Sequence, residues 1–181
     1  MQSDHELVNG CRKNNLTHQE ALYKKYYAFG MSVCLRYAQN RDDALEILND
    51  SFMKVFKNIH QFDLDRPFKT WFRRILINTA VDHNRKKLKS IHIAQVELDE
   101  ESAIVPSDIE LNMNVDDILL LFNKLPDIHR MIFNLYEIEG YSHEEIAGML
   151  DIAPGTSRSH LSRAKKSLAL LYDNHIARRD A

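Results

Sequence analysis

The chain has 181 residues, and 44% of them are hydrophobic, which is enough for one or two small cores. With 24 basic and 26 acidic residues the formal net charge is −2, which excludes a protein that coats nucleic acid through general basicity. The sequence has no signal peptide, no apolar run of membrane-spanning length, and two distant cysteines that form neither a disulfide framework nor a zinc motif, so we expect a cytoplasmic protein.

The first half of the chain is predicted to be helical. Thr17 and Glu20 have the spacing of a capping box, which predicts the start of one helix. Asn40 is a candidate cap for the next helix, whose apolar residues recur at helical spacing over residues 45–59. A loop follows, and Pro67 is expected to begin a third helix because proline fits the first turn.

Charge is distributed unevenly along the chain. Residues 66–89 contain eight basic side chains and one acidic one, whereas residues 97–117 contain eight acidic side chains and no Lys or Arg. Together with the absence of sustained periodicity, this predicts an acidic linker at residues 91–112 between helical domains at residues 1–90 and 113–181. The fold class expected is all-α.

The C-terminal part carries the most informative pattern, which is typical of a helix-turn-helix. After a predicted helix that Gly140 ends, Ser142 and Glu145 form a capping box that opens a short helix. Residues 151–153 are a tight turn, and Pro154 begins a second helix. A helix placed in this way can enter the major groove of DNA.

The second helix of this pattern has polar and basic residues on its outer side. Its candidate DNA-contacting residues are Thr156, Ser157, Arg158, Ser159, His160, Arg163 and Lys166. Ser157 falls on the inward side of the helix, so its hydroxyl is expected to need a backbone partner. An ordinary amphipathic hairpin with a solvated basic face is the alternative, but the short turn and the one-sided charge favour DNA binding.

The segment of residues 62–87 contains both aromatic and basic residues. This mixture suits single-stranded nucleic acid, because cations follow the backbone and rings stack on bases. The alternative is that Trp71 and Phe72 are core residues, as aromatic side chains in helices usually are.

Several segments together resemble one family. Residues 42–56 resemble the helix that docks on the clamp of RNA polymerase, and residues 68–75 with Asn78 resemble the helix that recognises the −10 promoter element. Residues 141–168 resemble the domain that recognises the −35 element. The chain therefore resembles an extracytoplasmic-function sigma factor, the minimal two-domain class of the sigma-70 family, over residues 7–172.

The resemblance implies a function and a set of sites. Core RNA polymerase, promoter DNA and an anti-sigma factor are the expected partners, with no cofactor, metal or small-molecule substrate. The implied polymerase-docking residues are Asp43, Glu46, Asn49, Asp50 and Lys54. The implied −10 residues are Phe62, Lys69, Trp71, Arg73, Arg74, Asn78, Arg85 and Lys86. The residues from Thr156 to Lys166 named above would recognise the −35 element.

The sequence departs from the family pattern at two positions, and two other functions remain as alternatives. The family usually has an aliphatic residue at the position of Ser157, and often Arg at that of His160. A stand-alone helix-turn-helix regulator would explain the C-terminal domain alone. A metal-dependent enzyme could use the acids at positions 42, 43, 46 and 50, but we favour a solvated helix face, because no nucleophile–base pair or phosphate-binding loop accompanies them.

Overall fold

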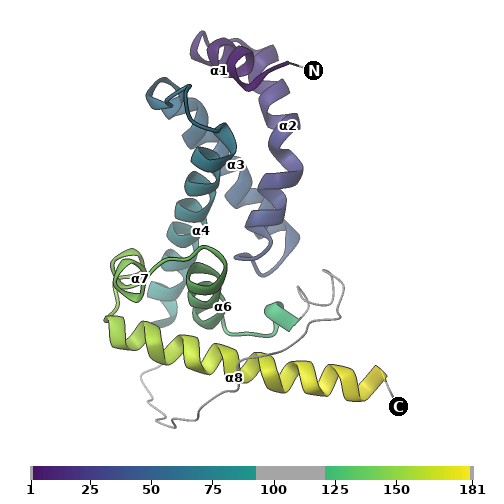
Figure 1. Cartoon of the computed structure of the whole chain (residues 1–181), viewed down its shortest axis with the longest axis vertical. Helices are drawn as coiled ribbons and strands as arrows, with labels where there is room; N and C mark the ends of the chain where they lie inside the picture. Colours follow the sequence, from purple (N-terminus) through teal and green to yellow (C-terminus); the bar gives the residue numbers. More distant parts are fainter. Residues whose placement is uncertain (1, 93–120, 180–181) are drawn as a thin grey trace. The chain divides into compact units, whose positions relative to one another are not determined.

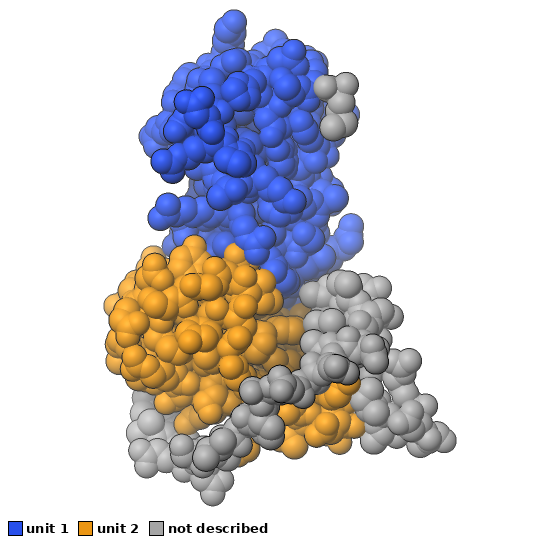
Figure 2. All heavy atoms as spheres, viewed as in Figure 1, with its two compact units in different colours: residues 1–83 blue, residues 84–181 orange. Residues whose placement is uncertain are grey.

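The chain folds into helices that form two compact units, Met1–His83 and Asn84–Ala181 (Figure 2). The computed structural model describes residues 2–92 and 121–179, and the side chains of 2–85 and 121–174. Within these ranges every regular element is helical, which confirms the predicted all-α fold. No described helix combines the length and apolar character that crossing a bilayer demands. The predicted linker at 91–112 lies outside the described residues from position 93 onward.

Unit 1 begins with two helices whose caps were not predicted correctly. Helix α1 (Asp4–Arg12) has a capping box in which Ser3 and Glu6 bond each other's backbone amides. Helix α2 (Leu16–Cys34) is capped by Asn15, whose Oδ1 accepts a hydrogen bond from the backbone N–H of His18 at 3.3 Å. The capping box predicted at Thr17 is therefore wrong, because Thr17 already lies inside the helix.

The next helices agree with their predicted starts. Helix α3 (Arg41–Asn58) is capped by Asn40, whose Oδ1 accepts from the backbone N–H of Asp43 at 2.8 Å. A 3₁₀ turn, η1 (Ile59–Gln61), leads into the loop, and α4 (Phe68–His92) starts directly after Pro67 (Figure 1).

The core of unit 1 is a cluster of aromatic rings contributed by α2, α3 and α4. Phe72 lies fully buried at its centre, with ring centroids 4.7 Å from Phe52, 5.8 Å from Phe68 and 6.0 Å from Tyr26. Gly30 on α2 allows this approach, since a Cβ there would overlap the Cδ1 atom of Leu48. Edge-on and offset ring pairs of this kind add to the burial of apolar area. The cluster fixes α3 and α4 against α2.

Unit 2 contains the predicted helix-turn-helix. Helix α6 (Asp127–Phe133) continues into a π-helical turn, η2 (Asn134–Ile138), which ends before Gly140 at a φ of +78°. Gly140 thus ends the helix as predicted, because a left-handed φ costs glycine little. Helices α7 (His143–Leu150) and α8 (Pro154–Arg179) follow.

A buried arginine lies in the core of unit 2. The Arg130 side chain is 1% exposed, and its guanidinium donates to Asp127 Oδ1 at 2.8 Å and to Asn123 Oδ1 at 3.0 Å. The carbonyl of Arg130 also accepts from Asn134 Nδ2 at 2.9 Å. A buried charge with partners of this kind is tolerated, whereas losing one partner would be costly.

Candidate functional site

The geometry of the turn between α7 and α8 is that of a helix-turn-helix. Ser142 Oγ accepts from the Glu145 N–H at 3.2 Å, and Glu145 Oε2 accepts from the Ser142 N–H at 2.8 Å, which confirms the predicted capping box. Asp151 adopts the left-handed conformation with φ of 59°, and α8 starts at Pro154. The predicted turn at residues 151–153 is thereby confirmed.

Helix α8 has a buried side and a polar side. Ser157, Leu161 and Ala164 are buried. On the other side, Thr156, Arg158, Ser159 and Lys166 are exposed, while His160 and Arg163 are half-buried. The periodicity thus places six of the seven predicted −35 residues on an accessible surface, and Ser157 inside.

Ser157 makes a hydrogen bond that differs from the expected one. Its Oγ lies 2.9 Å from Nδ1 of His143 on α7, so its partner is a side chain and not the backbone. The His143 ring stacks on Tyr136 with centroids 4.4 Å apart. Desolvation, followed by the charge of Arg158, lowers the pKa of His143. The bond therefore joins the two helices of the motif, and sequence reasoning missed His143.

Arg158 has an acidic neighbour at the proposed DNA surface. Its Nη2 lies 2.9 Å from Glu144 Oε1, and both side chains are more than half exposed, at 58% and 66%. An exposed pair of this kind contributes little to stability. Breaking this ion pair, so that the guanidinium can contact a phosphate or a base, therefore costs little free energy.

Two histidines of unit 2 lie against each other. The rings of His129 on α6 and His160 on α8 have centroids 5.1 Å apart. Burial, with the charges of His160 and Arg163, lowers the pKa of His129 to about 4. His129 is therefore neutral at physiological pH and packs as an uncharged ring behind the polar side of α8.

The aromatic residues of the predicted −10 segment fall into two groups. Phe62 and Phe72 are buried, at 4% and 0% exposed, so the core alternative is correct for Phe72. Trp71 is half-buried, and its ring centroid lies 5.0 Å from that of Phe62. Phe62 thus supports Trp71 from beneath, and Trp71 is the ring that a base could reach.

The polar residues of this segment lie along α4. Lys69 is exposed, with Nζ 4.6 Å from the ring centroid of Phe29. Arg74 and Asn78 are also exposed, and Arg73 and Arg85 are half-buried. Lys86 lies on α4, but its side chain is outside the described part of the chain. Arg74, Asn78 and Arg85 follow Trp71 at helical spacing and so share its side of α4, whereas Lys69 and Arg73, each two residues from Trp71, lie on another side.

The predicted docking residues form a stripe on α3. Glu46, Asn49 and Asp50 are exposed, and Asp43 and Lys54 are half-buried. The Tyr23 hydroxyl donates to Asn49 Oδ1 at 3.1 Å, and Lys54 Nζ lies 3.2 Å from Asp82 Oδ2.

Met53 belongs to the same stripe, although sequence reasoning missed it. The residue is 69% exposed, an unusual state for a large apolar side chain. The signal was available, because Met53 stands four residues after Asn49 and so shares its helix face. The stripe is therefore polar with one apolar centre, a composition common in protein interfaces.

Comparisons with known proteins agree with this division. Sigma-70 region 2 matches residues 22–89, and Sigma-70 region 4 matches residues 116–168. The ECF RNA polymerase sigma factor SigW of Bacillus subtilis is 30% identical over an alignment of 150 residues, which covers 75% of this chain and 79% of that one. The ECF RNA polymerase sigma-E factor of Escherichia coli is 27% identical over 177 residues, or 92% of each chain.

A solved structure has a similar fold. It is the sigma factor RpoE in complex with the anti-sigma factor NepR from Bartonella quintana, with a TM-score of 0.52 and 23% identity over 85% of this chain and 96% of that one. The matches to sigma-70 regions 2 and 4, one in each half of the chain, define a protein of the sigma-70 type. The chain belongs to the extracytoplasmic-function RNA polymerase sigma factors, which direct promoter-specific transcription initiation.

Proposed function

We propose that this chain binds core RNA polymerase, recognises both elements of its promoters and carries no catalytic site of its own. In this proposal residues 1–90 bind polymerase and the −10 element, residues 91–112 are the linker, and residues 113–181 recognise the −35 element. The observation that supports it is the presence in one chain of a helix-turn-helix and a separate helix, α4, that carries a half-buried tryptophan and basic residues. Its place of action is the cytoplasm, where polymerase works.

The −35 surface is the polar side of α8. Thr156, Arg158 and Ser159 are exposed in its first turns, where a recognition helix contacts base edges. His160, Arg163 and Lys166 continue the surface. Ser157 is left out, because its buried hydroxyl is 2.9 Å from His143 Nδ1 and cannot reach DNA in this conformation.

The −10 surface is the exposed part of α4 with the loop before it. Arg74 and Asn78 are exposed on the side of α4 that carries Trp71, and Arg85 continues this side. Lys69 is exposed and Arg73 half-buried on another side of the same helix. These cations would follow the backbone of the melted strand, and Trp71 would stack on an unpaired base, an interaction worth roughly 1–3 kcal/mol per base.

The docking surface is the α3 stripe. Glu46, Asn49 and Asp50 surround the exposed Met53, and we expect this apolar side chain to provide buried area while the acids select a basic partner. An anti-sigma factor would regulate the protein by covering these surfaces.

Transcription from a mixed template tests the whole proposal. The purified chain is combined with bacterial core polymerase and a genomic DNA library, and the transcripts are sequenced. We expect start sites that share −35 and −10 motifs. Sequence-specific duplex binding with no transcription and no polymerase binding would instead indicate a stand-alone regulator.

Single substitutions test the docking surface. Asp50→Ala and Met53→Ala should each weaken binding to core polymerase while leaving duplex DNA binding unchanged. Glu20→Ala is the matched control, because Glu20 is an exposed acid on α2, outside the stripe. Equal polymerase affinity in all three variants would place the docking surface elsewhere.

A further inference from the structure

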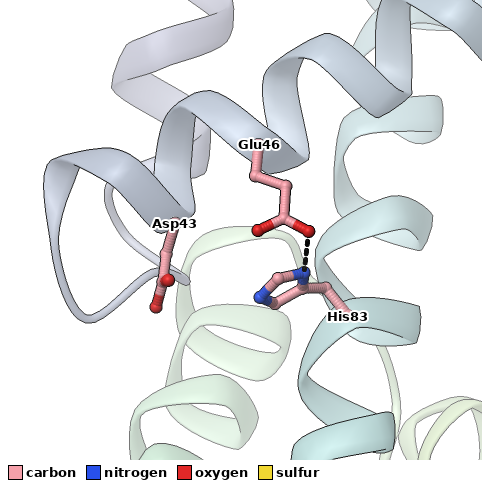
Figure 3. A group of neighbouring side chains, drawn as sticks. All are labelled: Asp43, Glu46 and His83. Carbon is pink, nitrogen blue, oxygen red and sulfur yellow. Dashed lines mark ion pairs between the residues drawn. The ribbon is translucent and has the colours of Figure 1, made fainter.

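Three potential metal ligands lie together on α3 and α4, within unit 1. Asp43 and Glu46 stand one turn apart on the same face of α3, and His83 lies on the facing side of α4 (Figure 3). One ligand atom from each residue lies within 4.8 Å of the other two. No other such group of three occurs among the residues whose placement is described. Helical bundles build metal sites in this way, from i, i+3 pairs on one helix and a ligand on its neighbour.

The contacts within this group do not satisfy its histidine. Nδ1 of His83 is 4.0 Å from Oε1 of Glu46, which exceeds the length of a hydrogen bond. Nε2 of His83 has no hydrogen-bond partner within the described part of the chain. The imidazole therefore has a ring nitrogen without a hydrogen bond, in a group whose other two members are carboxylates.

We propose that Asp43, Glu46 and His83 bind one divalent transition-metal ion of the zinc class and so link α3 to α4. An imidazole with two carboxylates is a ligand set for zinc and its neighbours, whereas magnesium and calcium take oxygen ligands. The two carboxylates balance the charge of the ion, and water completes the coordination.

Zinc binding needs only a small movement of the three side chains toward one another. Zinc binds nitrogen and oxygen at about 2.0–2.2 Å, so ligand atoms around a tetrahedral ion lie roughly 3.4 Å apart. Donor atoms that lie within 4.8 Å of one another therefore have to approach by up to about 1.4 Å. Glu46 can do this by rotation, because its side chain is 63% exposed, whereas His83 is 16% exposed and held in place.

The sequence reasoning missed this site for an identifiable reason. The acids of α3 were interpreted as a solvated face, because no nucleophile–base pair, phosphate-binding loop or zinc-type spacing accompanies them in the sequence. His83 comes from another helix, and only the fold brings it to Glu46. Asp43 and Glu46 also belong to the proposed docking surface, so a bound ion would remove negative charge from the edge of that surface.

Zinc binding by the full chain, without an affinity tag, tests the proposal and requires no polymerase. Zn²⁺ is titrated in competition with a chromophoric chelator, and one equivalent is expected to bind, with Mg²⁺ unable to compete. Glu46→Gln and His83→Gln should each weaken Zn²⁺ binding about tenfold or more, since loss of even an outer-shell partner costs that much. With Co²⁺ as probe, the same variants should lose its visible absorption bands.

Controls separate this site from the rest of the chain. Asp42→Asn and His60→Gln remove an exposed acid and an exposed histidine outside the group, and should bind Zn²⁺ like the parent. The thiols do not compete, because Cys11 and Cys34 are buried and burial raises their pKa values to about 11 and about 12.

Glu46 is exposed, so Glu46→Gln should not affect folding. A loss of Zn²⁺ affinity in this variant therefore cannot be attributed to misfolding. Unchanged Zn²⁺ affinity in Glu46→Gln and His83→Gln would overturn the proposal. So would the absence of saturable one-to-one binding by the parent chain.

Discussion

The hydrogen bond between Ser157 and His143 should stabilise the helix-turn-helix without contributing a DNA contact. Ser157 is fully buried, and the 2.9 Å between its Oγ and His143 Nδ1 is the length of an ordinary hydrogen bond. Ser157→Ala should therefore destabilise unit 2 by about 1 kcal/mol, the usual net value of such a bond. The penalty stays near this value because His143 is only half-buried, so water can reach the nitrogen left behind.

A double-mutant cycle isolates the bond from other losses. His143→Ala also removes the stacking on Tyr136, but that loss occurs with either residue at position 157 and cancels in the cycle. The coupling energy should be about 1 kcal/mol. The readout is hydrogen exchange of the α7 and α8 amides in the full chain, which should become about fivefold faster in Ser157→Ala.

Two results would refute this reasoning. Additive effects of the single substitutions would show that the two side chains do not interact. A loss of duplex DNA affinity greater than the loss of stability would restore Ser157 as a DNA contact. Ser162→Ala is the matched control, because Ser162 is exposed on the same helix and its hydroxyl should not affect exchange.

Three further predictions concern the core, the pH response and the DNA surface. Gly30→Ala should destabilise unit 1 by roughly 1–3 kcal/mol in chemical denaturation, because the new Cβ would overlap Leu48; a stabilised variant would contradict the packing. His129 has a folded-state pKa of about 4, below its unfolded value, so its stabilising effect is complete above pH 6.5 and is lost as the pH falls towards 4. Allowing for solvent screening, unit 2 should lose roughly 1–2 kcal/mol of stability over this pH range. A pKa near 6.5 for the His129 ring, measured by NMR titration, would contradict this prediction. Arg158→Ala should weaken −35 DNA binding by ~1–3 kcal/mol, and Glu144→Gln should strengthen it slightly, both measured by titration of labelled duplex; opposite signs would mean that Arg158 faces away from DNA.

Local sequence rules predicted most helix starts, but they failed at α1 and α2. Asn40 and Ser142 were identified because a cap acts within three residues of itself. At α2 the same rule admits both Asn15 and Thr17, and Asn15 is the residue that caps the helix. The α1 box formed by Ser3 and Glu6 has the same pattern and was overlooked.

Within the candidate sites, the sequence predicted the features that follow from the periodicity of a single helix. The spacing along α8 separates the exposed Ser159 from the buried Leu161, because residues two apart point to different sides of one helix. Two contacts involve residues from two different helices. They are the hydrogen bond between Ser157 and His143 and the approach of Glu46 to His83. Such contacts depend on how helices pack, which single-residue patterns do not encode. The same limit explains why Phe62 was expected at the surface and lies beneath Trp71.

The placement of Trp71 gives the protein an intrinsic optical reporter. It is the single tryptophan of the chain, and it lies half-buried over Phe62, on the surface where a melted strand would bind. A nucleobase that stacks on an indole quenches its emission. Strand capture could therefore be followed in real time on the unlabelled protein, whereas unit 2 contains no tryptophan and contributes no background signal.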